Sequence, residues 1–315
     1  MLRFLRLVPI LLLCCCCGCA TIQPTASTPA VTSDTIIVTG ASGELGSHVI
    51  SALLKRGVPA RQLILVSRTP EKMQEYVRMG ARARYGDFFQ PQTLPAAFAG
   101  GQRMLLISVA GNVPTFELHK NAIDAAVRAG VKHIAYTSIL GADTFNGTLA
   151  HFHLQTERYL KNSGVGWTLL RNGLYADRIP DRAVLMVTSG HVVVPADERP
   201  LAYVTHADLA EAAAVVLTTD GHDGEAYELT GPELIDYVRI AGIASQITGK
   251  PIAVERVAAD APLDPTSAPL ARREFPSMVS PAIQQLTGHA PMSVRALLEA
   301  DKAKLLAATG KTPVQ

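Results

Sequence analysis

The chain has 315 residues, of which 48% are hydrophobic, and its 29 basic and 27 acidic residues give a formal net charge of +2. This near-balance excludes the strongly basic surface of a nucleic-acid-binding protein, so no nucleic-acid partner is expected. The apolar content can fill a large core, and the length suits one α/β body with a smaller lobe.

The N-terminal segment has the pattern of a secretion signal. Two arginines precede an apolar run at residues 7–13, which is short for a membrane-spanning helix. All five cysteines lie within residues 14–19, which excludes disulfide and zinc frameworks from the rest of the chain. Cys19 follows a small residue as in a bacterial lipobox, so residues 1–19 are expected to be a lipoprotein-type signal peptide with lipid attached to Cys19.

A tether is expected after this signal, because residues 20–33 are rich in Thr, Ser, Pro and Ala. The lipid would then anchor an exported protein to a membrane on the periplasmic or cell-surface side. An uncleaved hydrophobic anchor, with the folded part on the cytoplasmic face, is the alternative.

A glycine-rich motif lies at residues 35–46, Thr-Ile-Ile-Val-Thr-Gly-Ala-Ser-Gly-Glu-Leu-Gly. β-forming residues lead into glycines spaced G-x-x-G-x-x-G, and apolar residues at helical spacing follow as far as Gly57. A strand, a glycine turn and a helix place backbone N–H groups and the positive end of a helix dipole around a site for a pyrophosphate. A tight turn without a ligand is the alternative. The residues expected to bind the dinucleotide here are Gly40, Ala41, Ser42, Gly43, Glu44 and Leu45.

The end of the second expected strand, residues 63–67, bears on the choice of cofactor. NAD-preferring folds place a carboxylate there for the ribose 2′-hydroxyl. Here Arg68 follows the strand and Lys72 lies one turn later, with no carboxylate before Glu71. A guanidinium suits a 2′-phosphate, so NADP(H) is the predicted cofactor. A solvated surface arginine is the alternative.

The next two strands contribute further candidates. Asp87 ends the strand at residues 83–85, where it can accept from the adenine amino group or act as a cap or turn residue. The apolar run at residues 104–108 predicts a strand in the middle of a parallel sheet. The loop that begins at Ser108 and Val109 is expected to pass over the cofactor.

Strands and helices alternate from residue 34 onward, and six such units predict a doubly wound, Rossmann-type parallel sheet with its ligand at the carboxyl ends of the strands. Residues 34–175 are expected to form the NADP-binding domain, to which residues 200–230 return. Residues 176–199 and 231–315 are expected to form a smaller substrate lobe. The expected helices of this lobe cover residues 179–188, 232–247, 270–286 and 293–306. A further helix, residues 209–217, is expected after the Thr205–Asp208 capping box.

Five segments together carry a family resemblance: residues 38–46, 86–87, 129–138, 168–175 and 227–231. They resemble the atypical short-chain dehydrogenases of the NmrA-like group, and within it the type 2 NAD(P)H:quinone oxidoreductases. The resemblance covers nearly all of the expected folded part. It implies an NADP-binding domain, a C-terminal substrate lobe, and hydride transfer from the nicotinamide to a quinone or a similar small acceptor.

One departure from related carbonyl reductases concerns the proton donor. Those enzymes use Tyr-x-x-x-Lys, whose tyrosine donates a proton. Phe152 and Thr156 have this spacing here, and none of the eight tyrosines has a lysine four residues on. Reduction of a quinone tolerates the loss better, because a quinone accepts hydride readily and water can protonate its oxygens.

The resemblance also implies residues for the acceptor side of the site. His153 is expected near the nicotinamide, and Ser138 and Tyr175 are expected to form hydrogen bonds in the acceptor pocket. Their structural alternatives are a surface imidazole, a strand-end cap and a packing ring, respectively. No metal site is predicted, because His151 and His153 lie two apart on a helix and point in different directions.

Three functions stay open at this point. The first is an NADPH-dependent reductase, and the second is a non-catalytic NADP-binding sensor or regulator, which the missing Tyr and Lys would allow. The third is an exported domain that keeps the fold and binds something else, because NADPH is not normally supplied outside the cytoplasm. A homodimer is also left open.

Overall fold

The computed structural model describes residues 33–109, 115–144, 147–262, 265–267 and 275–310. The expected signal peptide, Cys19 and nearly all of the expected tether lie outside these residues. No described helix is both long and apolar enough to cross a membrane.

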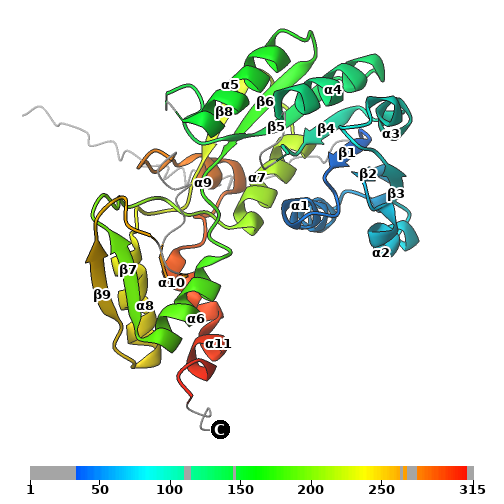
Figure 1. Cartoon of the computed structure of the whole chain (residues 1–315). Helices are drawn as coiled ribbons and strands as arrows, with labels where there is room; N and C mark the ends of the chain where they lie inside the picture. The colour runs from blue at the N-terminus through cyan, green and yellow to red at the C-terminus, as the bar shows by residue number, and fades with distance from the viewer. Residues whose placement is uncertain (1–32, 110–114, 145–146, 263–264, 268–274, 311–315) are drawn as a thin grey trace, which may run out of the picture. The chain divides into compact units, whose positions relative to one another are not determined.

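A parallel sheet of seven strands forms the centre of the fold, in the order β3-β2-β1-β4-β5-β6-β8 (Figure 1). All of its strand pairs are parallel. The order reverses between β1 and β4, which is where doubly wound folds bind their ligands. The strands are β1 Ile36–Thr39, β2 Leu63–Ser67, β3 Arg82–Tyr85, β4 Arg103–Leu106, β5 His133–Ile139, β6 Gly166–Asn172 and β8 Glu225–Leu229.

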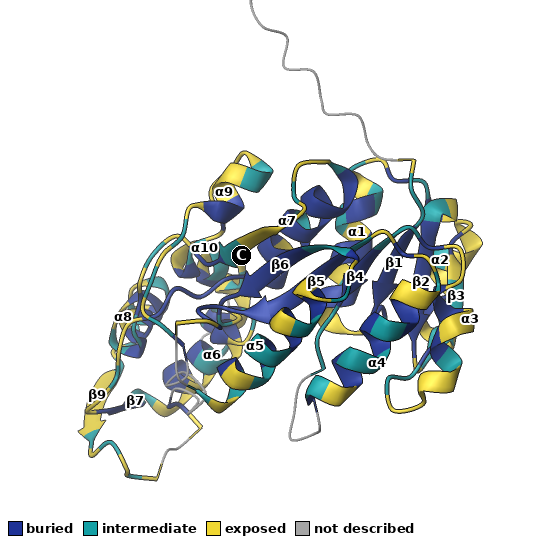
Figure 2. Cartoon of the chain, turned by 90° about the horizontal axis from the view of Figure 1, so that it is seen from above, coloured by how far each residue is buried: buried dark blue, intermediate teal, exposed yellow. Residues whose placement is uncertain are grey.

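Helices cover both faces of this sheet, as its buried central strands require (Figure 2). One face packs against α1 Glu44–Lys55 and α7 His206–Thr218. The other packs against α3 Leu94–Phe98, α4 Thr115–Arg128 and α5 Thr148–Lys161. Short helical segments complete the connections: η1 Ala60–Gln62, η2 Pro70–Met73, α2 Gln74–Arg78, η3 Pro91–Thr93 and α9 Ala282–Thr287.

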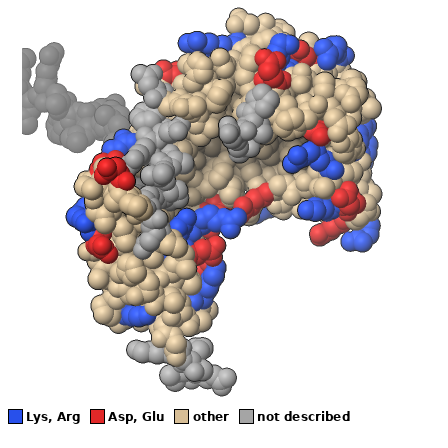
Figure 3. Space-filling model, viewed as in Figure 1, with Lys and Arg blue, Asp and Glu red and all other residues tan. Residues whose placement is uncertain are grey.

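A separate apolar core belongs to the C-terminal lobe. Strands β7 His191–Pro195 and β9 Ala253–Val257 form a second, parallel sheet of two strands. The helices of the lobe are α6 Ile179–Ser189, α8 Tyr237–Thr248, α10 Val294–Ala300 and α11 Lys302–Ala307. Basic and acidic side chains are interspersed over the face drawn in Figure 3.

The predicted fold class is confirmed, and so is the capping box, in which the Thr205 side chain accepts from the N–H of Asp208. The start of α8 is a correction. The sequence places it at residue 232, but Ile235 is bridged to Leu201, and the helix starts only after Asp236, whose side chain accepts from the N–H of Arg239.

The two last expected helices are also corrected. Residues 268–274 lie outside the described residues, and within 275–286 only α9 is helical. The expected helix at residues 293–306 is divided at Asp301, which ends α10 and begins α11. Helical spacing of apolar residues continues across such a break, so periodicity alone cannot reveal it.

Candidate cofactor cleft and its neighbourhood

A cleft of about 630 Å³ lies at the carboxyl ends of β1, β2, β3 and β4. Eight of the eleven residues predicted to bind the cofactor line it: Gly40, Ser42, Gly43, Arg68, Lys72, Asp87, Ser108 and Val109. The other three are not among its lining residues: Ala41 and Leu45 are buried, and Glu44 is the exposed first residue of α1. Residues that the sequence singled out from separate strand ends therefore line one cleft, and cofactor binding by them stays a prediction.

The glycine turn has the shape that a diphosphate needs. Gly40 has φ +59°, and its carbonyl accepts from the N–H of Gly43 at 2.9 Å. A Cβ on Gly46 would lie 2.3 Å from the same carbonyl oxygen, so only glycine fits where α1 meets β1. Gly43 caps α1 without a side-chain hydrogen bond, which leaves first-turn N–H groups available to an anion.

Hydroxyls and cations meet at the far end of β2. The Ser67 hydroxyl lies 2.7 Å from that of Ser42 and 3.2 Å from that of Thr69. Arg68 and Lys72 beside them are exposed and form no ion pair with another described residue. This group of donors suits a phosphate.

Asp87 has the turn role that the sequence offered as one alternative, and its predicted contact with the adenine stays a prediction. Its Oδ1 accepts from the N–H of Phe89 at 3.0 Å, as a turn aspartate does, and Gln90 donates to its Oδ2 at 3.4 Å. The residue also lines the cleft. The turn bond therefore holds the carboxylate at the cleft wall.

Val109 is held by a histidine that sequence reasoning did not single out. Its N–H donates to Nε2 of His119 at 2.9 Å, so we place the ring proton on Nδ1. That nitrogen lies 3.1 Å from the Thr156 hydroxyl and 3.2 Å from the Tyr136 hydroxyl. His119 is fully buried, and its distance along the chain from residue 109 hid this contact from motif analysis.

His153 belongs to the same buried cluster. Its Nδ1 lies 2.7 Å from the Tyr136 hydroxyl, and burial lowers the pKa of the imidazole to about 4. The alternative of a surface imidazole is therefore wrong for His153. His151, two residues earlier on α5, is exposed.

Ser138 and Tyr175, the other two candidates for the acceptor side of the site, are not among the residues that line the cleft. The Ser138 hydroxyl donates to Glu157 at 2.6 Å, and both Glu157 oxygens accept from the buried Arg171. Tyr175 is 42% exposed, and its ring centroid lies 4.2 Å from that of His206. None of Ser138, His153 and Tyr175 is among the residues that line the cleft.

Comparison with known proteins agrees with this geometry. A family model described as NAD(P)H-binding matches residues 40–220. Quinone oxidoreductase 2 of Escherichia coli is 38% identical over 222 residues, which are 70% of this chain and 77% of that protein. The NAD(P)H azoreductase of Xenophilus azovorans is 27% identical over 219 residues, 69% of this chain and 75% of that one.

Solved structures extend the similarity beyond the matched segment. Triphenylmethane reductase from Citrobacter sp., in complex with NADP(H), has a TM-score of 0.76 and 32% identity, covering 84% of this chain and 99% of that one. The NADPH complex of the Escherichia coli quinone oxidoreductase has a TM-score of 0.75 and 33% identity with the same coverage. The chain therefore belongs to the NmrA-like NAD(P)H-binding family, among its NAD(P)H-dependent reductases.

Proposed function

We propose that the protein is an NADPH-dependent reductase that transfers hydride to a quinone or a similarly small conjugated acceptor. The observation that carries the proposal is the cleft itself, in which a glycine turn at one strand end is joined by Arg68 and Lys72 at the next. The names of two relatives, a quinone oxidoreductase and an azoreductase, support this class of acceptor.

In this proposal the first turn of α1 binds the diphosphate through the N–H groups that follow Gly43. Arg68 and Lys72, with the hydroxyls of Ser42 and Thr69, hold the 2′-phosphate by charge-assisted hydrogen bonds. NADPH supplies a hydride when it is bound, and the chain supplies its orientation.

The three candidates for the acceptor side have different roles in this proposal, because one side chain is exposed and two are buried. Tyr175 is exposed and can donate its hydroxyl proton to an acceptor oxygen. Ser138 and His153 are buried and bonded to protein groups, so they act as positioning residues. His153 would act through Tyr136 and His119 on the backbone of Val109, at the cleft wall.

A non-catalytic NADP-binding sensor is the second candidate. It is favoured by Phe152 and Thr156 at the Tyr-x-x-x-Lys spacing, which leave α5 without the usual proton donor. Stopped-flow mixing of NADPH-loaded protein with 1,4-naphthoquinone under anaerobic conditions separates the two candidates. If the protein is a reductase, the NADPH absorbance at 340 nm falls over many turnovers. If it is a sensor, NADPH is oxidised no faster than in a mixture without protein.

Membrane attachment through Cys19 stays part of the proposal. It rests on the lipobox-like sequence at residues 17–20, outside the described residues. Intact-mass analysis of protein purified from membranes is expected to show a mature chain that begins at an acylated Cys19. A mass corresponding to the uncleaved chain would instead support the uncleaved anchor.

A further inference from the structure

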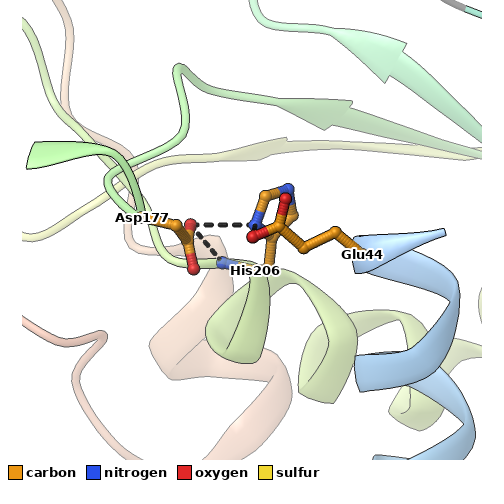
Figure 4. A group of neighbouring side chains, drawn as sticks. All are labelled: Glu44, Asp177 and His206. Atoms are coloured by element: carbon orange, nitrogen blue, oxygen red, sulfur yellow. Dashed lines mark hydrogen bonds and ion pairs between the residues drawn. The ribbon is translucent and has the colours of Figure 1, made fainter. Parts of the chain in front are cut away.

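Three side chains from distant parts of the sequence converge outside the cleft (Figure 4). Glu44 is the first residue of α1, His206 is the first residue of α7, and Asp177 precedes α6. One nitrogen or oxygen from each lies within 4.8 Å of the other two. No spacing in the sequence connects these residues, which is why the sequence predicted no metal site.

The imidazole nitrogen at the centre of this group has no hydrogen-bond partner. Nδ1 of His206 lies 3.0 Å from Asp177 Oδ2 and 3.9 Å from Glu44 Oε1. It is buried and yet makes no hydrogen bond. The 3.0 Å distance is within hydrogen-bond range, so the direction of Nδ1 rather than its separation from Asp177 prevents the bond. Asp177 Oδ2 accepts from the backbone N–H of His206 and stands within ion-pair distance of Nδ1 (Figure 4).

Helix dipoles account for only part of this arrangement. Carboxylates near the N-terminal ends of α1 and α7 are favourable on that ground alone. The dipoles do not explain why a buried ring nitrogen is placed within ion-pair distance of both carboxylates and forms a hydrogen bond with neither. A cation between Nδ1 and the two oxygens would give Nδ1 a ligand bond and would bring the two carboxylates together on one charge.

The distances suit such a cation. With bonds of 2.0–2.2 Å, neighbouring ligand atoms of an octahedral ion lie about 3 Å apart. The His206–Asp177 separation already has this value, and the Glu44 side chain is 53% exposed and able to move closer. The Arg178 guanidinium lies 4.0 Å from the other oxygen of Glu44, Oε2, which leaves Oε1 directed at the ring.

We propose that Glu44, Asp177 and His206 form a binding site for a divalent first-row transition-metal cation. The two carboxylates suit Mn²⁺, and the imidazole suits the later metals of the row. Three protein ligands leave the other coordination positions to water, as in sites that are open to solvent. The site adjoins the cofactor cleft, because Glu44 follows Gly43, but it is assembled without the cofactor.

Electron paramagnetic resonance with Mn²⁺ tests this site in the full chain without NADPH. Mn²⁺ is the probe because the N-terminal cysteines would compete for Zn²⁺. We expect one bound Mn²⁺ per chain, with affinity at least tenfold weaker in Glu44→Gln and in Asp177→Asn. Spin-echo modulation from an imidazole nitrogen should be present in the wild type and lost in His206→Ala.

The control is His151→Ala, which removes an exposed histidine elsewhere and should leave Mn²⁺ affinity unchanged. Glu44→Gln keeps the size of a half-exposed side chain, so it tests the site even if His206→Ala does not fold. Failure of the wild type to bind Mn²⁺ at 1 mM would overturn the proposal. Equal binding by wild type, Glu44→Gln and Asp177→Asn would overturn it as well. Either result leaves the proposed reductase function untouched, because no cofactor is present.

Discussion

Arg68 is the residue on which cofactor choice depends in this account. It is exposed at the cleft, where it forms no ion pair with another described residue. Removal of a charge-assisted hydrogen bond costs about 1.5–3 kcal/mol, so Arg68→Ala should raise the Kd for NADPH by about 10- to 100-fold. The Kd for NADH should change little, because NADH has no 2′-phosphate.

Equilibrium titration of both nucleotides into wild type and Arg68→Ala measures these constants. Arg78→Ala serves as the matched control, because Arg78 is an exposed arginine on α2 that does not line the cleft. Equal losses for NADPH and NADH in Arg68→Ala would show that Arg68 does not read the 2′-phosphate.

Local chemistry made some residues predictable and left others hidden. Gly40, Gly43 and Arg68 could be placed at the cleft because they directly follow strands in the sequence. His119 and Asp177 could not, since their roles depend on contacts with Val109 and His206, which only the folded chain brings within 3.0 Å.

At the scale of elements, the junction of β1 with α1 has the tightest packing constraint in the cofactor site. An alanine Cβ at Gly46 would lie 2.3 Å from the Gly40 carbonyl oxygen, which is backbone and cannot move aside cheaply. Gly46→Ala should therefore lower the free energy of unfolding by about 1–3 kcal/mol and weaken NADPH binding. Thermal unfolding and nucleotide titration measure the two effects.

Gly242→Ala is the matched control for this substitution. Gly242 also lies inside a helix, α8, but no atom lies within 4 Å of its would-be Cβ. Helix propensity should then stabilise this variant by about 1 kcal/mol. If both substitutions had the same effect, close approach of backbones at Gly46 would not be the reason for its glycine.

The sequence predicted the elements of the sheet domain better than those of the lobe. Buried parallel strands are continuous apolar runs, so β2 and β4 were evident. The lobe helices begin and end where tertiary contacts decide, as at Asp236 and Asp301, and their bounds were missed.

At the scale of the whole molecule, two buried imidazoles make stability depend on pH. Burial, with the neighbouring His153, lowers the pKa of His119 to about 3, and burial lowers that of His153 to about 4. The unfolded chain, with imidazole pKa near 6.5, binds more protons than the folded chain below that value, so acid favours unfolding. The loss between pH 6.5 and 5 is roughly 2 kcal/mol per histidine.

Urea denaturation at pH 7.5 and pH 5.0 measures this loss. His153→Gln should lose less stability between the two pH values than the wild type, because one of the two buried groups no longer titrates. His151→Gln, on the exposed side of the same helix, should behave like the wild type. An unchanged acid loss in His153→Gln would contradict the assignment of His153 as a neutral buried group.

The central claim is that the glycine turn at residues 40–46 and Arg68 together bind a dinucleotide with a 2′-phosphate. Calorimetric titration of the purified full chain with NADPH and with NADH tests it most directly. We expect one NADPH to bind per chain, with a Kd at least tenfold lower than that for NADH. Absence of binding by either nucleotide, or equal affinity for both, would contradict it.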